Sequence, residues 1–268
     1  MTVQRAPSSR LSRGLLATLL ATSLLASCAP KTASSDLPVL RVASQKGGTK
    51  ALVLASHVLD GAPFKVEWSE FPSAQTLLEA LGAGAVDLGA VGDAPFLFAY
   101  ANDPKLKVVQ VGGSGLKGEA VAVVVGAASP IHTAADLKGR KVATGKGSIG
   151  HYLLLRLLAR AHIKPSEVQI LFLAPGDAKA ALASGAVDAW ATWTPYTELE
   201  LRHDGGRILA DGAGLMDVFG FEASSDSAIA ARRPQIADFL ARLSRAYAWQ
   251  HTHEADFAQV LSLSLIHI

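Results

Sequence analysis

The residues best suited to chemistry in this sequence form a glycine-rich turn between a short extended segment and an apolar helical run. The turn reads Gly145-Lys-Gly-Ser-Ile-Gly150, and the helical pattern continues from His151 to Ile163. Glycines let the backbone approach a ligand closely, and the first amides of the helix have no partner within it. These amides lie at the positive end of the helix dipole, and Ser148 is in position to cap it. The turn therefore predicts a site for a small anion.

The same six residues also match G-x-G-x-x-G, the fingerprint of dinucleotide-binding sites. That alternative requires an acidic residue about 20 positions further on, which would bind the ribose. Glu167 falls near that distance, but it follows Pro165-Ser166 in a pattern typical of a helix start. We therefore favour the anion site and keep the dinucleotide site as the alternative.

A second copy of the motif supports the anion site. Lys46-Gly-Gly48 follows the extended segment Val39–Ser44 and precedes an apolar helical run, as Lys146-Gly-Ser148 also does. Further along, Gly-Ala-Val-Asp occurs at 84–87 and again at 185–188. Two α/β units that each aim a glycine-rich helix start at one cleft would clamp a small anion from both sides.

We predict that the ligand contacts come from the two turns and from the ends of neighbouring strands. Amides and hydroxyls would bind the anion, Lys46 and Lys146 would neutralise it, and Trp193 would cover an organic tail. Asp93 and Thr194 each precede a helix with proline in its first turn, which favours capping. The candidate ligand-binding residues are Gln45, Lys46, Gly47, Gly48, Thr49, Gly92, Asp93, Lys146, Gly147, Ser148, Ile149, Gly150, His151, Trp193 and Thr194.

The first residues have the pattern of an exported lipoprotein. Three arginines precede an apolar stretch over 14–26 that is too short to span a bilayer comfortably. Leu25-Ala-Ser-Cys28 resembles the bacterial lipobox, whose cysteine is lipidated after cleavage; an ordinary signal peptide is the alternative. Cys28 is the only cysteine, so an intrachain disulfide cannot form. We expect a signal peptide over 1–27, and the lipidated cysteine with its tether over 28–38.

Charge and motifs exclude several functions. The chain has a net charge of +2, but residues 1–27 contain three arginines and no acidic residue, so the mature charge would be −1. We therefore expect no nucleic-acid partner. The sequence shows neither a Ser-His-Asp pattern nor a zinc motif, which predicts no catalytic residues, no metal and no cofactor. His251-Thr-His-Glu254 has metal-binding residue types but lacks a partner cluster.

From residue 38 onward, short apolar runs alternate with helical patterns, which is typical of α/β folds with largely parallel sheets. A short helical turn capped by Thr133 is expected at 133–137, and 227–230 should precede the last helix. Strands are predicted near 39–44, 64–68, 86–91, 107–111, 121–125, 140–144, 168–173, 187–191 and 207–209. Helices are predicted near 48–60, 73–82, 94–101, 149–162, 177–184, 195–203 and 233–249.

Several motifs taken together resemble the aliphatic-sulfonate-binding proteins of ABC importers. They are Gln45-Lys-Gly47, Trp68–Pro72, Gly84–Gly89, Gly92–Pro95, Ala135–Gly139, Lys146–Ser148, Asp188–Trp190 and Trp193–Tyr196. The resemblance covers about residues 39–250. It implies the type II periplasmic-binding-protein fold, with two lobes, a mostly parallel sheet flanked by helices in each lobe, and the ligand in the cleft between them.

The resemblance also implies a function and partners. The chain would be an extracytoplasmic lipoprotein that acts as a monomer, captures a sulfonate for sulfur acquisition and delivers it to an ABC permease in the inner membrane. Relatives in the superfamily take taurine, nitrate or thiamine-precursor pyrimidines, and an enzyme on the same clamp fold is the alternative of another class. Family members often carry an acidic residue at the position of Thr194, which leaves the role of this threonine open.

The expected domain boundaries follow from the two crossings between the lobes. Residues 39–115 and 223–262 would form lobe 1, and residues 116–222 would form lobe 2. The final residues, Leu263–Ile268, resemble the translation of a sequencing adaptor. We therefore expect the reading frame to be cut short and lobe 1 to be truncated; a genuine apolar terminus is the alternative.

Overall fold

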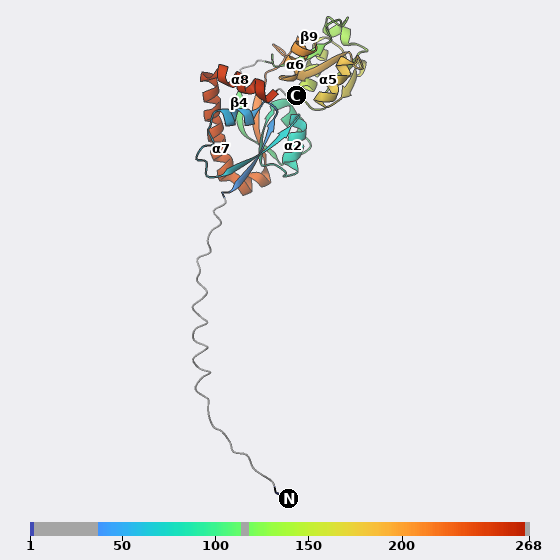
Figure 1. The fold of residues 1–268 in the computed structure, drawn as a ribbon. Helices are drawn as coiled ribbons and strands as arrows, with labels where there is room; N and C mark the ends of the chain where they lie inside the picture. Colours follow the sequence, from blue (N-terminus) through green and yellow to red (C-terminus); the bar gives the residue numbers. More distant parts are fainter. Residues whose placement is uncertain (3–36, 114–117, 266–268) are drawn as a thin grey trace. The chain divides into compact units, whose positions relative to one another are not determined.

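The computed structural model describes residues 1–2, 37–113 and 118–265 (Figure 1). Cys28 and nearly all of the proposed signal peptide and tether therefore lie outside the described residues, as do 266–268. The chain from Leu37 onward forms one compact unit. Within the described ranges, every helix is too short or too polar to span a membrane.

The first sheet has the strand order β2-β1-β3-β10-β4. Its strands are β1 (Val39–Gln45), β2 (Lys65–Phe71), β3 (Leu88–Gly92), β4 (Leu106–Gly113) and β10 (Phe219–Ser225). Four of the strands run in one direction, and β10 runs antiparallel to both of its neighbours. The helices that accompany this sheet are α1 (Thr49–Ala55), α2 (Ala74–Gly82), α3 (Asp93–Tyr100), α7 (Asp226–Thr252) and α8 (Glu254–Leu265). We call this set of elements lobe 1.

The second sheet repeats this plan with the order β7-β6-β8-β5-β9. Its strands are β5 (Val121–Val125), β6 (Lys141–Thr144), β7 (Gln169–Phe172), β8 (Ala189–Trp193) and β9 (Arg207–Asp211). Here β5 is the antiparallel strand. The helices are the 3₁₀ turns η1 (Ala134–Leu137) and η2 (Pro165–Glu167), with α4 (Ile149–Arg160), α5 (Pro175–Ala183) and α6 (Tyr196–His203). We call this set of elements lobe 2.

Apolar side chains hold helices on both faces of each sheet. In lobe 1, α1 and α7 pack through residues such as Leu52 and Phe239 on one face, and α2 and α3 pack through residues such as Leu77 and Phe96 on the other. Figure 1 shows α7 and α2 on opposite sides of this sheet. In lobe 2, α4 covers one face, and α5 and α6 cover the other. Burial of this apolar surface is the main force that fixes the layers.

The repeated Gly-Ala-Val-Asp motif performs the same structural task in both lobes. The Asp87 carboxylate accepts the Arg41 backbone N–H at 2.9 Å, and the Asp87 N–H donates to the Arg41 carbonyl at 2.8 Å. The Asp188 carboxylate accepts the Lys141 N–H at 2.8 Å, and the Asp188 N–H donates to the Lys141 carbonyl at 2.8 Å. Asp87 thus ties the approach to β3 to the neighbouring strand β1, and Asp188 ties the approach to β8 to the neighbouring strand β6.

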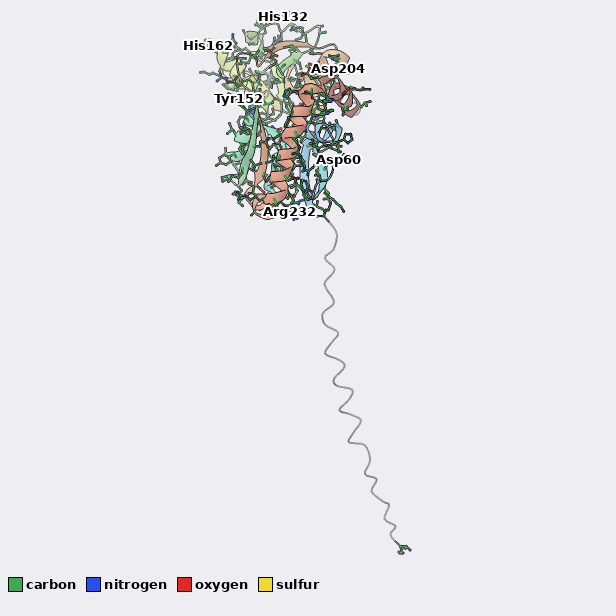
Figure 2. All side chains as sticks on the ribbon, turned by 90° about the vertical axis from the view of Figure 1, so that its left-hand side faces the viewer. Asp60, His132, Tyr152, His162, Asp204 and Arg232 are labelled. Carbon is green, nitrogen blue, oxygen red and sulfur yellow. The ribbon has the colours of Figure 1, made fainter. Side chains whose placement is uncertain are left out.

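Two parts of the predicted element order are wrong. Residues 227–230 are helical, because α7 begins at Asp226, and β10 just before them was not predicted. Within α7, Arg232 is non-helical (φ −131°, ψ 18°), and Pro234 follows two residues later (Figure 2). This kink divides α7 into two helical segments, and the second begins at Arg233-Pro234 as predicted, because proline lacks a donor and is tolerated in the first turn of a helix. The helix α1 also ends earlier than expected, at Ala55.

Candidate functional site

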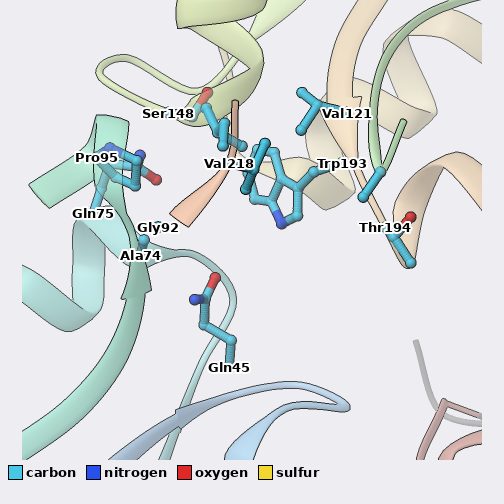
Figure 3. A pocket seen from close by; sticks show the side chains of 12 residues that line it. Gln45, Ala74, Gln75, Gly92, Pro95, Val121, Ser148, Trp193, Thr194 and Val218 are labelled. Atoms are coloured by element: carbon cyan, nitrogen blue, oxygen red, sulfur yellow. The ribbon is translucent and has the colours of Figure 1, made fainter. Parts of the chain in front are cut away.

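A cavity of about 170 Å³ lies where the two lobes meet, at the carboxyl ends of their parallel strands (Figure 3). Lobe 1 lines it with Gln45, Ala74, Gln75, Gly92 and Pro95. Lobe 2 and its connections line it with Ala120, Val121, Ser148, Ile149, Trp193, Thr194 and Val218. Ligands of open α/β sheets usually bind outside the carboxyl ends of the strands, so this is the expected place for a site. We call it the interlobe pocket.

The structure brings six of the predicted ligand residues together in this pocket. They are Gln45, Gly92, Ser148, Ile149, Trp193 and Thr194. Figure 3 shows Ser148, Trp193 and Val218 on one side, with Gln45 approaching from the other. The pocket therefore combines polar donors with an apolar wall that includes an indole ring.

The turn before α4 is built to present Ser148. Gly147 has φ +69°, a conformation that favours glycine, and the Ser148 N–H closes the turn on the Gly145 carbonyl at 3.0 Å. The Ser148 side chain is buried at 1% exposure, and its Oγ accepts the His151 N–H at 3.0 Å. This confirms the prediction that Ser148 caps the helix.

The Ser148 hydroxyl keeps a hydrogen that it can donate to a ligand. Its neighbour Thr144 lies 3.4 Å away, which is long for an O–H···O bond. Thr144 Oγ1 is itself positioned to donate to the Ala191 carbonyl at 3.0 Å. A ligand oxygen in the pocket could therefore accept the Ser148 proton without breaking the cap, because the cap uses a lone pair of the oxygen.

On the lobe 1 side, the start of α2 supplies a residue that sequence reasoning missed. Ala74 and Gln75 form the first turn of α2 and line the pocket. The Gln75 Nε2 atom is shielded from solvent and has no hydrogen-bond partner in the structure. A buried amide donor without a partner is costly, and a bound acceptor would satisfy it. The signal was present in the sequence, since Ser73 precedes a helical pattern that follows a strand.

Gln45 is held in place at the end of β1. Its Nε2 donates to the Ala90 carbonyl at 3.2 Å, which fixes the side chain along the neighbouring strand β3. A primary amide has a second N–H, and this one remains to be donated. Gln45 and Gln75 thus offer two neutral donors from lobe 1, opposite Ser148 of lobe 2.

Other predicted site residues lie outside the interlobe pocket. Lys46 and Lys146 are exposed at the surface. Lys146, Gly147 and His151 line a neighbouring cavity of about 530 Å³ with residues of α2 and α3. Thr49 is buried, and its hydroxyl faces Tyr247 of α7.

Asp93 and Thr194 do not occupy the helix cap positions that the sequence suggested. Gly92 is the cap of α3, and Asp93 follows it as the first helical residue. The Asp93 carboxylate accepts the Ala94 N–H at 2.7 Å and the Phe219 N–H at 3.3 Å, so it ties α3 to β10. In α6 the cap position belongs to Pro195, and the Thr194 hydroxyl lies 3.2 Å from the Thr197 hydroxyl.

Three of the predicted site glycines, Gly48, Gly92 and Gly150, differ in what an added side chain would meet. A Cβ on Gly150 would lie 2.5 Å from the Ala191 carbonyl oxygen, so this glycine allows α4 to pack closely on β8. A Cβ on Gly48 would lie 2.9 Å from the Gln45 carbonyl oxygen within its own turn. At Gly92 the nearest atom of lobe 2 would be Ile149 Cδ1 at 3.7 Å. Of the three, only Gly92 lines the pocket.

Residues that a dinucleotide site or a metal site would use make other contacts in the structure. Glu167, the residue that a dinucleotide ribose would need, accepts the Lys164 N–H at 2.9 Å and pairs with Lys138 at 2.8 Å. These contacts, with the Lys138 hydrogen bond first, lower the pKa of Glu167 below its ordinary value. Of the late histidines, His253 stacks on Trp249 at a centroid distance of 4.7 Å. The described residues contain no group of three or more His, Cys, Asp or Glu side chains arranged to hold a metal ion.

The electrostatics of the pocket are those of a neutral site. Its lining, within the described part of the chain, contains no charged side chain. The amides at the starts of α2 and α4 have the polarity that favours an anion. An anion in this pocket would therefore be bound by oriented neutral donors.

Two α/β lobes of equivalent strand order with such a pocket between them have the architecture of a periplasmic binding protein. The chain belongs to the NMT1/THI5-like family, whose model matches residues 64–256. This agrees with the fold that the sequence motifs implied.

Relatives of known name agree with this assignment. A putative aliphatic sulfonates-binding protein of Escherichia coli is 42% identical over 212 residues, which are 78% of this chain and 66% of the relative. This chain thus spans slightly less than two thirds of that relative's length.

The solved structures that are similar to this chain include two sulfonate-binding proteins. The periplasmic aliphatic sulphonate binding protein SsuA of Escherichia coli has 38% identity and a TM-score of 0.71, with 85% of this chain and 79% of that chain covered. The alkanesulfonate-binding protein SsuA of Xanthomonas axonopodis pv. citri, solved with MOPS, has 34% identity and a TM-score of 0.77, with 86% and 80% covered.

Proposed function

We propose that this chain is the substrate-binding component of an ABC importer and that it captures aliphatic sulfonates. The observation that carries the proposal is the interlobe pocket, in which neutral donors from both lobes face an apolar wall. The names of the similar proteins support the same ligand class. Thr194, where family members often carry an acidic residue, adds a neutral side chain to this lining.

The chemistry of the sulfonate group suits these donors. A sulfonate stays anionic at any working pH, so it needs no ionisable partner to keep its charge. Amides and hydroxyls stabilise it without a buried lysine having to lose its water. Hydrogen bonds to a charged acceptor contribute about 1.5–3 kcal/mol each, so several of them support micromolar affinity. We assign the oxygens to Ser148, Gln45, Gln75 and the first amides of α4.

The organic tail would lie against the apolar part of the pocket. Trp193 at the end of β8 offers an indole face, and Val121 and Val218 lie beside it (Figure 3). Indole rings bury large areas of alkyl or aryl surface. A tail of a few carbons therefore adds affinity over inorganic anions, which have none.

Calorimetric titration of the ligand-depleted full chain tests the function. The probes are 1-butanesulfonate, taurine, nitrate, inorganic phosphate and an aminopyrimidine. We expect micromolar binding of butanesulfonate, with nitrate and phosphate at least tenfold weaker. Tighter binding of nitrate, phosphate or the pyrimidine than of any sulfonate would contradict the proposal. Recovery of the sulfonate unchanged from the mixture would agree with a binding protein and disagree with an enzyme.

We further propose that the protein works outside the cytoplasm, anchored by lipid on Cys28, and passes its ligand to a membrane permease. The basic start, the short apolar stretch and the lipobox-like sequence support this location. Expression of Cys28→Ala beside the unaltered chain, followed by membrane fractionation, tests the anchor. The variant should move to the soluble envelope fraction. Equal membrane association of both forms would contradict the anchor.

A further inference from the structure

His151 and the turn before α4 are joined by two reciprocal hydrogen bonds. The Gly147 N–H donates to His151 Nδ1 at 3.2 Å, and the His151 N–H donates to Ser148 Oγ at 3.0 Å. The first bond restrains the glycine at φ +69°, and the second orients the hydroxyl in the interlobe pocket. The imidazole itself does not line that pocket, since it lies in the neighbouring cavity.

Aromatic contacts hold the imidazole ring in place. It stacks on Phe98 with a centroid distance of 5.8 Å and an interplanar angle of 17°. It also meets Phe172 edge-on, at 5.1 Å and 76°. Phe98 belongs to α3 of lobe 1, while Phe172 ends β7 of lobe 2, so the ring lies at a contact between the lobes. A restrained ring keeps Nδ1 aimed at the Gly147 amide.

The acceptor role fixes the protonation state of the ring. Nδ1 can accept the Gly147 N–H only when it carries no proton, so the ring is neutral with its proton on Nε2. Burial, and then the charge of Lys146, lower the pKa of His151 below its ordinary value. The charged side chains that line the same cavity as the ring are Lys146 of its own turn and Glu79 and Asp103 of lobe 1.

We propose that His151 is a positioning residue for sulfonate binding, which acts through its Nδ1 acceptor on the Gly147–Ser148 turn and makes ligand affinity fall on acidification. The inference rests on the proposed function and extends it. Protonation of Nδ1 turns the acceptor into a donor that faces the Gly147 N–H, so the turn loses its restraint. Ser148 and the first α4 amides then lose their alignment for the ligand.

The direction of the pH effect separates this role from direct contact. A protonated imidazole that touched the sulfonate would attract it, so affinity would rise as the pH falls. A positioning histidine predicts the opposite sign. The sulfonate stays anionic throughout, so its own titration does not contribute.

Two variants isolate the acceptor. His151→Asn places Oδ1 near the site of Nδ1, so it can accept the Gly147 N–H but cannot titrate. His151→Phe keeps an aromatic ring between Phe98 and Phe172 but has no acceptor. The full chain and both variants are titrated calorimetrically with 1-butanesulfonate between pH 8 and pH 4.5, and the His151 ring is followed by NMR over the same range.

The unaltered chain should lose affinity about fivefold as the His151 ring becomes protonated. His151→Phe should be about fivefold weaker at pH 8, and His151→Asn should restore most of that loss with a flatter pH profile. Other groups titrate in all three proteins, so the difference between profiles is decisive. A rise in affinity on acidification, or the same profile in His151→Asn, would overturn the inference alone. Absence of sulfonate binding by the unaltered chain would overturn the proposed function and this inference with it.

Discussion

The two glycine turns that begin α1 and α4 share a backbone but differ in their chemistry. Gly47 and Gly147 both have φ +69°. The Gly48 N–H closes the first turn on Gln45 at 2.9 Å, and the Ser148 N–H closes the second on Gly145 at 3.0 Å. The sequence repeat is thus a true structural repeat at this point of the two lobes.

The difference lies in how each helix starts. In lobe 1 the cap residue is Gly48, which has no side chain, and the Lys50 N–H is accepted by the upstream Ser44 hydroxyl at 3.1 Å. In lobe 2 the cap is Ser148, whose hydroxyl lines the interlobe pocket. The helix α1 is 7 residues long and α4 is 12 residues long. The first helix start of lobe 1 does not line the pocket, and the proposed donors of this lobe are Gln45 at the end of β1 and Gln75 at the start of α2.

The largest effect should come from the glycine that follows the second turn. Gly150→Ala places a Cβ 2.5 Å from the Ala191 carbonyl oxygen, which forces α4 away from β8. Overpacking of this kind costs about 3 kcal/mol when backbone must move. We expect the free energy of unfolding, measured in urea, to fall by about that amount.

The equivalent site in lobe 1 supplies the control. Lys50 stands there, with its Nζ paired to Glu70 at 2.5 Å near the surface. Lys50→Ala removes an exposed ion pair, which contributes about 0–1 kcal/mol. Equal losses from Gly150→Ala and Lys50→Ala would contradict the assigned difference in packing.

A second asymmetry concerns the antiparallel strand of each lobe. Glu222 of β10 pairs with Ala90, the third residue of β3, while Val123 of β5 pairs with Ala191, the third residue of β8. Both side chains are buried, but burial raises the pKa of the Glu222 carboxyl to about 7. In the unfolded chain a glutamate titrates near pH 4.3, so the folded state binds more protons between about 4.3 and 7.

Stability should therefore fall as the pH rises through this window, by roughly 2–3 kcal/mol in total. Glu222→Gln removes the titrating group and should flatten this part of the pH profile of unfolding. Glu67→Gln, at an exposed position of β2, serves as the control and should leave the profile unchanged. A profile that stays the same in Glu222→Gln would show that another group controls it.

A smaller effect should come from a hydrogen bond between the lobes. Tyr196 Oη of α6 donates to the Pro72 carbonyl of lobe 1 at 3.0 Å, and its ring packs on Trp193 at a centroid distance of 5.7 Å. Tyr196→Phe keeps the ring and removes about 1 kcal/mol of bonding between the lobes. Sulfonate affinity should fall about fivefold. Tyr152→Phe is the control, because the described part of the chain shows no hydrogen bond to the Tyr152 hydroxyl.

Much of this architecture could be predicted from sequence because it rests on local rules. Strand patterns, the turn glycines and the Ser148 cap each depend on a few adjacent residues, and the structure agrees with them. Long-range strand pairing was harder to predict from sequence. β10 lies between β3 and β4 in the sheet but far from both in the sequence, so its short apolar pattern alone did not predict the strand.

The pocket was predicted only in part for the same reason. Gln75 reaches it because α2 follows β2 toward the same sheet edge, which only the folded topology shows. Lys46 and Lys146 were expected near the anion because their charge suits it. They lie exposed outside the lining, where each ammonium keeps its water.

The most direct test of the proposed anion site is the substitution Ser148→Asp. Aspartate caps a helix about as well as serine, so the melting temperature should stay close to that of the unaltered chain. The new carboxylate would face the sulfonate, and affinity for 1-butanesulfonate should fall at least a hundredfold by calorimetry. Ser148→Ala, which removes one donor, should cost about tenfold, and Lys146→Ala, outside the pocket lining, less than threefold. Unchanged affinity in a folded Ser148→Asp protein would mean that the sulfonate does not bind at the start of α4.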